Sequence, residues 1–290
     1  ENPQGDKPIE QRGLENVRAA VNWAKTNLNN RFTNLALAGE SAGAIGVQIW
    51  ASTLLKEFEY DSASVLADSY VGIFPPGFQG PVFHELNVCD SGLLNDELRD
   101  QCFKEELTIA DVYESTMKEF PHVAFGSLNS KHDVGQIMFY NLAATTVQVQ
   151  KVAKFCNTQV GDECDMSAAP PELLVPQSPL AYPAYHQRMD EVIDRYSSQP
   201  NYVSYVMSSG MHTITPFVYG ECPLINYDEG VSGTSGFWEG ASGAQRRDLR
   251  EWLKAYFFQH NSLKSVCEKR LPQDEDDYCQ SAQEEKVLAV

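Results

Sequence analysis

Apolar and polar residues follow one another along this chain in two patterns, one helical and one strand-like. Between Gly13 and Asn27 an apolar residue recurs every three or four positions, which predicts an amphipathic helix. A polar stretch follows, and then Leu35–Ala38 forms an uninterrupted apolar run of strand length. This part of the chain is therefore predicted to be a helix followed by a buried strand.

The same two patterns continue through the rest of the chain. Three further strands are predicted at Ser62–Phe74, Pro121–Asp133 and Asn201–Phe217. Four further helices are predicted at Ile109–Lys118, Val134–Cys156, Ala184–Tyr196 and Gln245–Gln259. Strands that alternate with helices favour a mostly parallel sheet with helices on both faces, so we expect one α/β domain over residues 1–290. Residues 161–196 start rich in Pro and Ser and are expected to form a lid or a surface insertion.

The sequence Gly-Glu-Ser-Ala-Gly at residues 39–43 lies directly after the first predicted strand. This G-x-S-x-G pattern is typical of the nucleophile elbow, a sharp turn that needs little side-chain bulk on either side of the serine. Small and apolar residues at helical spacing follow it, as the elbow requires. Ser41 is therefore the candidate nucleophile, and the backbone N–H of Ala42 is the candidate oxyanion donor. The pattern also occurs by chance, so an ordinary glycine-rich turn is the alternative.

A nucleophilic serine needs a histidine base, and the base needs a carboxylate partner. His212 is the candidate base because it follows the last predicted strand, where a loop would bring it over the edge of the sheet. The other histidines occupy helices or loops, or come too early in the chain: His84, His122, His132, His186 and His260. Asp133, after the third strand, is the preferred acid, although it could instead cap the next helix. Asp68, after the second strand, is the alternative acid or a carboxylate with a structural role.

At this point several stretches resemble the pectin acetylesterase family, which includes the carboxylesterase Notum. They are residues 1–55, LADSYVGIF, NSKHD and SSGMHTITPF. The resemblance implies an α/β-hydrolase-like fold and a secreted serine esterase that removes O-acyl groups, acetyl above all, without a cofactor or a metal. It also implies that Ser41, Asp133 and His212 are the nucleophile, acid and base. The family's glycine-rich oxyanion loop lies upstream of the elbow, and nothing like it precedes Gly39 here.

The net charge of the chain disfavours two classes of binding partner. Its 290 residues carry 22 basic and 40 acidic side chains, a formal net charge of −18. Such a charge repels nucleic acids and anionic membrane surfaces, so neither is expected as a partner. No apolar run approaches the roughly 20 residues that span a bilayer, so no membrane span is expected. The expected substrate is an acylated carbohydrate or another small ester, and the oligomeric state is not indicated.

Seven cysteines fall into couples that are close in the sequence. We expect disulfides between Cys89 and Cys102, Cys156 and Cys164, and Cys267 and Cys279, with Cys222 left over. Such bonds indicate an oxidising compartment and hence secretion, whereas seven free thiols would indicate the cytosol. The chain opens without Met and without a signal peptide, so its natural start and the oxyanion loop are expected to be missing. An esterase that lacks this loop could instead be a catalytically impaired binding protein.

Overall fold

The structure is a computed structural model that describes residues 12–28, 31–158, 164–170, 173, 179–215, 243–259, 263–268 and 286–290. Two of the seven cysteines, Cys222 and Cys279, lie outside these residues. The predicted pairing of Cys267 with Cys279 and the partner of Cys222 therefore stay open, as does much of the predicted insertion at 161–196.

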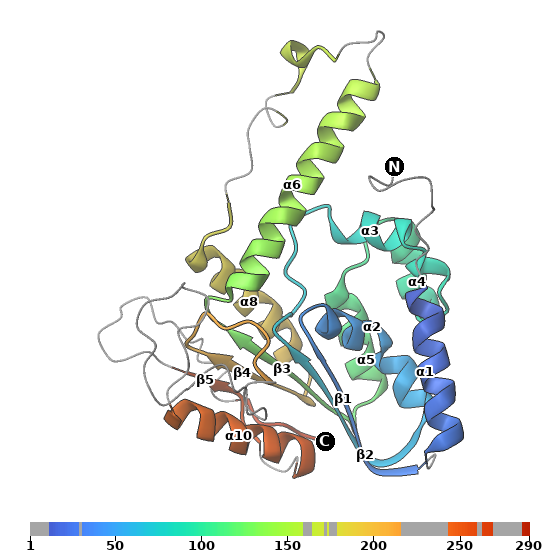
Figure 1. Ribbon diagram of the computed structural model, residues 1–290, viewed down its shortest axis with the longest axis vertical. Coiled ribbons are helices and arrows are strands. Elements are labelled where there is room, and N and C mark those ends of the chain that lie inside the picture. Colours follow the sequence, from blue (N-terminus) through green and yellow to red (C-terminus); the bar gives the residue numbers. More distant parts are fainter. Residues whose placement is uncertain are drawn as a thin grey trace.

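Among the described residues, five strands form a parallel sheet at the centre of the fold (Figure 1). The strands are β1 (Arg31–Glu40), β2 (Glu59–Asp68), β3 (Ala124–Ser130), β4 (Tyr202–Met207) and β5 (Val266–Cys267). They lie in the order β1-β2-β3-β4-β5, and each pairs with its neighbours in parallel. Because sequential parallel strands need a crossover, a helix or a longer connection returns the chain after each strand.

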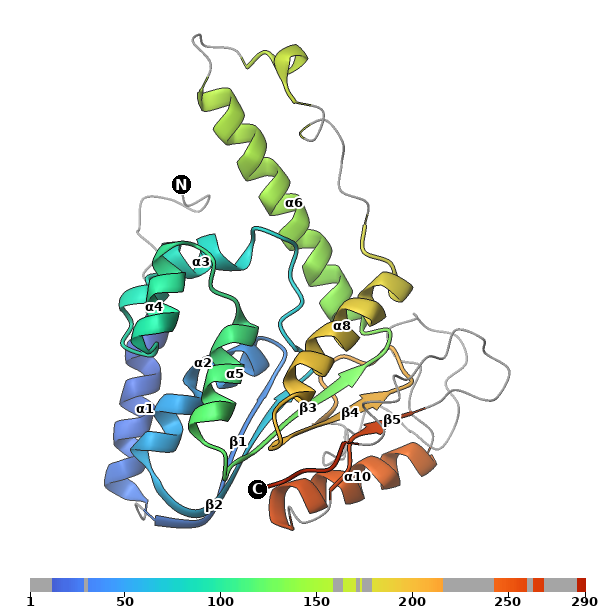
Figure 2. The same cartoon turned by 180° about the vertical axis from the view of Figure 1, so that it is seen from behind.

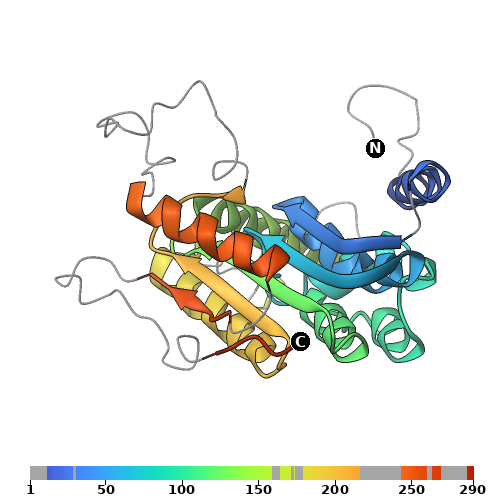
Figure 3. The ribbon, with the colours of Figure 1, turned by 90° about the horizontal axis from the view of Figure 1, so that it is seen from below.

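Helices cover both faces of this sheet, which confirms the predicted α/β fold class of a mostly parallel sheet covered on both sides. They are α1 (Gly13–Asn27), α2 (Ala42–Glu57), α3 (Gln79–Glu85), α4 (Asp96–Phe103), α5 (Ile109–Glu119), α6 (Val134–Asn157), α8 (Tyr182–Ser197) and α10 (Gly243–Phe258). Figure 3 shows α10 on one face of the sheet and α5 and α8 on the other. Helix α6 leaves the end of β3 and extends well beyond the sheet (Figure 2).

The hydrophobic core has two parts because successive side chains of a strand point to opposite faces. On one face, Val65 and Phe125 pack in a cluster with residues of α2, α5 and α8. On the other face, Leu66 and Ala124 pack in a second cluster with residues of α10. The near-continuous apolar pattern of these strands therefore reflects burial on both sides of the sheet.

Two strand ends differ from the sequence prediction. The second strand was expected to reach Phe74, but β2 ends at Asp68. Ser69 has a φ of 61°, a left-handed conformation that takes the chain out of the sheet. Likewise β4 ends at Met207, well before Phe217. Both early ends place polar residues at the edge of the sheet rather than within it.

Two of the three expected disulfides are present. Cys89 is bonded to Cys102 and Cys156 to Cys164, with sequence separations of 13 and 8. The Cys89–Cys102 bond is buried in a third small cluster, which packs beside α2 and α5. Part of the predicted insertion is helix α8, which contributes buried side chains to the main core. Within the described ranges, no helix is long and apolar enough to span a membrane.

Candidate active site

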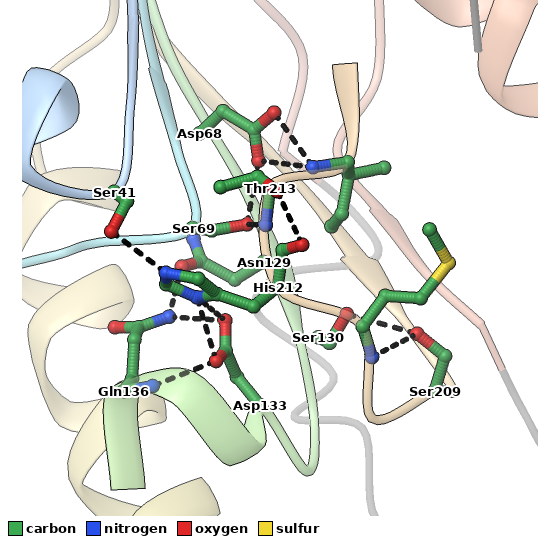
Figure 4. Close-up of polar contacts among 12 residues, drawn as sticks. Ser41, Asp68, Ser69, Asn129, Ser130, Asp133, Gln136, Ser209, His212 and Thr213 are labelled. Carbon is green, nitrogen blue, oxygen red and sulfur yellow. Dashed lines mark hydrogen bonds and ion pairs between the residues drawn. The ribbon is translucent and has the colours of Figure 1, made fainter. Parts of the chain in front are cut away.

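The candidate residues meet at the carboxyl edge of the sheet, each following a different strand. Ser41 follows β1, Asp68 ends β2, Asp133 follows β3 and His212 follows β4. Because neighbouring strands are parallel, their carboxyl ends lie at the same edge, where open α/β sheets bind their ligands. Figure 4 shows these four side chains close together.

Ser41 occupies a strained turn between β1 and α2. Its φ is 53° and its ψ is −118°, and its backbone N–H donates to the carbonyl of Asp68 at 2.9 Å. A β-carbon at Gly39 would overlap the carbonyl group of Gly43, so only glycine fits at position 39. A β-carbon at Gly43 would meet nothing within 4 Å among the described atoms. The steric requirement of the turn is therefore at Gly39, and not at both glycines as the motif suggests.

Ser41, His212 and Asp133 form a continuous hydrogen-bonded series (Figure 4). The Nε2 atom of His212 lies 2.7 Å from the Oγ atom of Ser41. The Nδ1 atom lies 2.9 and 3.0 Å from the two carboxylate oxygens of Asp133. The Asp133 side chain is fully buried and that of His212 is 19% exposed. A serine, a histidine and a buried carboxylate at these distances can activate the serine hydroxyl as a nucleophile.

The surroundings of His212 stabilise its protonated form. Burial of the imidazole lowers the pKa of His212, but the hydrogen bond to Asp133 and the negative charges of Asp133 and Asp68 outweigh it. The pKa therefore lies above the usual value for histidine. A base of this kind holds a proton more firmly after it has taken one from the serine.

Asp133 is held rigidly by the first turn of α6. As the N-cap of this helix, its carboxylate accepts from the backbone N–H of Gln136 at 2.8 Å. The side-chain amide of Gln136 donates to the same carboxylate at 2.9 Å and to Asn129 at 3.3 Å. Sequence analysis did not identify Gln136, although a polar residue three positions after an N-cap is a recognisable capping signal. Asp133 is thus both a helix cap and the partner of His212.

Asp68 binds the chain that follows His212 and does not contact the imidazole. Its buried carboxylate accepts from the backbone N–H groups of Ile214, at 2.9 Å, and Thr215, at 2.6 Å, and from the hydroxyl of Thr215. The neighbouring hydroxyl of Ser69 accepts from the backbone N–H of Thr213 at 2.9 Å. The end of β2 therefore fixes residues 213–215, directly after the candidate base.

The other described histidines lie outside this series. His84 faces Glu105 and His186 faces Asp190. His122 stacks on Tyr60, and the ring of His132 lies tilted against that of Tyr182. His260 lies outside the described residues. Over the part of the chain that the structure describes, no three His, Cys, Asp or Glu side chains gather as a metal site would require.

A cavity of about 400 Å³ opens beside Ser41. Its walls come from α2, from the segment between β2 and α3, from α3 and from α6. Ala42 lies both in this wall and at the first position of α2, where backbone N–H groups have no acceptor within the helix. Its N–H can therefore donate to an oxygen atom held next to Ser41.

Comparisons with known proteins do not assign the chain to a family. No family model matches it, and no curated protein matches it significantly. The structure is similar in part to that of an esterase of Pyrococcus furiosus, with a TM-score of 0.36 and 14% sequence identity over 86% of this chain. The chain spans 63% of the length of that esterase. The resemblance to the pectin acetylesterase family therefore stays a prediction.

Proposed function

We propose that this protein is a serine carboxylesterase with Ser41 as nucleophile, His212 as base and Asp133 as the acid that orients the base. The hydrogen-bonded series from Ser41 through His212 to Asp133 carries the proposal. Each of the three residues comes from a different strand end, so local sequence proximity does not explain their meeting. The strained backbone at Ser41 adds support, because such strain is concentrated at functional sites.

The proposed reaction transfers an acyl group first to Ser41 and then to water. His212 Nε2 takes the proton of the Ser41 hydroxyl while Oγ attacks the ester carbonyl carbon. The carbonyl oxygen becomes an oxyanion and accepts from the N–H of Ala42. The C–O bond to the alcohol then breaks, and His212 returns the proton to the departing alcohol. A water molecule, deprotonated by His212, attacks the acyl-enzyme and releases the carboxylic acid and the serine.

Asp133 sets the direction of this proton transfer. Its carboxylate can only accept at His212 Nδ1, so Nδ1 carries the hydrogen and Nε2 presents its lone pair to Ser41. When Nε2 becomes protonated, the negative charge of Asp133 stabilises the imidazolium. We assign Asp68 to a positioning role, because its hydrogen bonds hold residues 214 and 215.

We also propose that the esterase works outside the cell on an acylated carbohydrate or a related small ester. Disulfides persist in oxidising compartments, and the Cys89–Cys102 and Cys156–Cys164 bonds support that location. The sequence resemblance to pectin acetylesterases supports the carbohydrate substrate. The high negative charge disfavours nucleic acids as ligands.

Hydrolysis of p-nitrophenyl esters by matched serine variants tests the proposed function. Ser41→Ala should abolish turnover while the protein stays folded, because the turn depends on Gly39 rather than on the hydroxyl. Ser52→Ala is the control, since Ser52 is a half-buried residue of α2 whose hydroxyl donates to Glu119 and which does not line the cavity; this variant should keep wild-type rates. A wild-type protein that binds esters without hydrolysing them would favour the alternative, a catalytically impaired binding protein.

A further inference from the structure

The cavity beside Ser41 is almost entirely apolar near the nucleophile. Its walls there are Ala42 and Ile45 of α2, the three rings of Tyr70, Phe74 and Phe78, and Phe139 of α6. The three rings form a continuous aromatic wall, with centroid separations of 5.2 Å between Tyr70 and Phe74 and 5.3 Å between Phe74 and Phe78. The Tyr70 hydroxyl donates to the carbonyl of Ile73, so this polar group is already paired. A ligand in this part of the cavity meets carbon atoms.

Helix α6 gives the cavity its length. The lining residues Phe139, Ala143, Thr146 and Gln150 follow one another at helical spacing along one side of the helix. At 1.5 Å per residue, positions 139 to 150 span about 16 Å. The first two of these residues are apolar and the last two are polar, so polarity rises with distance from the start of α6, where Asp133 lies. The cavity is therefore partly open to solvent along α6, apolar near the start of this helix and polar further along it.

The cavity contacts the part of an ester that stays on the serine. Ser41 and Ala42 both line it, so an acyl group attached to Ser41 with its carbonyl oxygen at the Ala42 N–H would enter it. His212 does not line it. Because the leaving alcohol must lie at His212 Nε2 to receive a proton, the alcohol would occupy the opposite side of the serine.

The cavity is larger than an acetyl group requires. A volume of about 400 Å³ lies within the range of sites that bind whole drug-sized molecules. A water molecule takes up about 30 Å³ of liquid, and a methylene group is of similar size, so the cavity has room for about a dozen such groups. Glu85 of α3 also lines the cavity, and its carboxylate would repel an acyl tail that ends in a second carboxylate.

Building on the proposed function, we infer that the esterase prefers an uncharged, apolar acyl chain of medium length over acetyl. The acyl chain lies along α6 against the rings of Tyr70, Phe74 and Phe78. Each methylene that leaves water for an apolar wall raises kcat/KM about fourfold until the chain reaches the polar end. Specificity for acyl length is therefore a property of α6 and of the segment after β2.

The matched residues Thr145 and Thr146 of α6 provide the test. Both are exposed, and both hydroxyls bond to the carbonyl four residues earlier, but only Thr146 lines the cavity. We would measure kcat/KM for the full chain with p-nitrophenyl acetate, butanoate, hexanoate and octanoate. The wild-type ratio of octanoate to acetate should exceed about 10². Thr146→Trp should lower this ratio at least tenfold, whereas Thr145→Trp should leave it unchanged.

The outcomes separate this inference from the proposed function. A wild-type protein that hydrolyses acetate at least as fast as octanoate would overturn the acyl-chain inference and leave the esterase intact. Equal loss of the ratio in both tryptophan variants would also overturn it, because the effect would not come from the cavity. Absence of hydrolysis for every ester, in a folded protein, would instead count against the esterase itself.

Discussion

The imidazole of His212 lies directly against the backbone of Gly135. A β-carbon on residue 135 would be 2.5 Å from Cγ of His212 and 2.8 Å from Nδ1. No side chain fits there unless the ring moves. The glycine in the first turn of α6 therefore lets His212 lie next to Asp133, two residues earlier in the chain.

Gly135→Ala should displace the His212 ring and lower kcat/KM about 10²-fold, because misplacement of a catalytic group by about 1 Å costs a factor of this size. Gly46→Ala in α2 is the control, since a β-carbon there meets nothing within 4 Å among the described atoms. The measurement is steady-state hydrolysis of a p-nitrophenyl ester by both variants. Wild-type activity in a folded Gly135→Ala protein would show that His212 does not act from this position.

Asp133→Asn should keep the fold and lose the activity. Asparagine caps helices as well as aspartate does, so α6 should still begin at Val134. An amide can present a hydrogen to His212 Nδ1 and thereby favour the wrong tautomer, which in a comparable triad lowers kcat about 10⁴-fold. Circular dichroism would show whether the fold is kept, and ester hydrolysis would measure the loss of activity. A decrease below tenfold would exclude Asp133 as the acid.

The residual activity of Asp133→Asn should also have a different pH dependence. In the wild type, His212 must be neutral to act, so kcat/KM should rise with pH through a pKa above the usual value of about 6.5. Loss of the Asp133 carboxylate removes the hydrogen bond and the charge that raise this pKa. In Asp133→Asn, kcat/KM should therefore begin to rise at a lower pH than in the wild type. A shift to higher pH would contradict the assigned electrostatics.

Asp68→Asn should reduce kcat less than Asp133→Asn, by about 10- to 10²-fold. The amide nitrogen would face a backbone N–H of residue 214 or 215, which loosens the segment after His212 without removing its carboxylate partner. Asp61→Asn, on the exposed part of β2, is the matched control and should behave as the wild type. The pH profile of kcat/KM should move slightly to lower pH, because Asp68 also raises the pKa of His212. A larger loss than in Asp133→Asn would make Asp68 the acid.

The two disulfides should differ in their contribution to stability. Replacing Cys89 and Cys102 together by serine should lower the free energy of unfolding by about 2–4 kcal/mol. The same change at Cys156 and Cys164 should cost less, because Cys89 and Cys102 are buried among apolar side chains whereas Cys164 is exposed. Denaturant unfolding of the two double variants checks the order. Equal or reversed losses would contradict it.

The sequence predicts most of the elements because their patterns are local. The bounds of α1 match its apolar spacing, and α6 begins at Val134 as predicted. Strand β5 was not predicted, because two residues contain no periodicity and their pairing with Tyr205 and Val206 of β4 is a tertiary contact. The early end of β2 was missed for a related reason, since the apolar run continues into core residues such as Val71 and Ile73.

The candidate site was predictable as a set of strand ends but not as a set of contacts. Sequence order placed Ser41, Asp133 and His212 at one edge of the sheet, and the structure brings them within hydrogen-bonding distance. The sequence favoured Asp133 over Asp68 but did not exclude Asp68, because the two carboxylates lie at the ends of neighbouring strands. Their different hydrogen-bond partners depend on the path of residues 213–215. Ser69 was not predicted as a residue of the site for the same reason, because its hydroxyl contacts the backbone of Thr213.

Labelling by a fluorophosphonate tests most directly whether Ser41 is an activated nucleophile. The number of labels per chain and the labelled residue are measured. An activated serine displaces fluoride from the probe and forms a covalent phosphonate, which intact mass and peptide mapping detect. We expect one label per chain, on Ser41, with labelling lost in Ser41→Ala and retained in Ser52→Ala. An unlabelled wild-type protein, or a label on another residue that persists in Ser41→Ala, would contradict it.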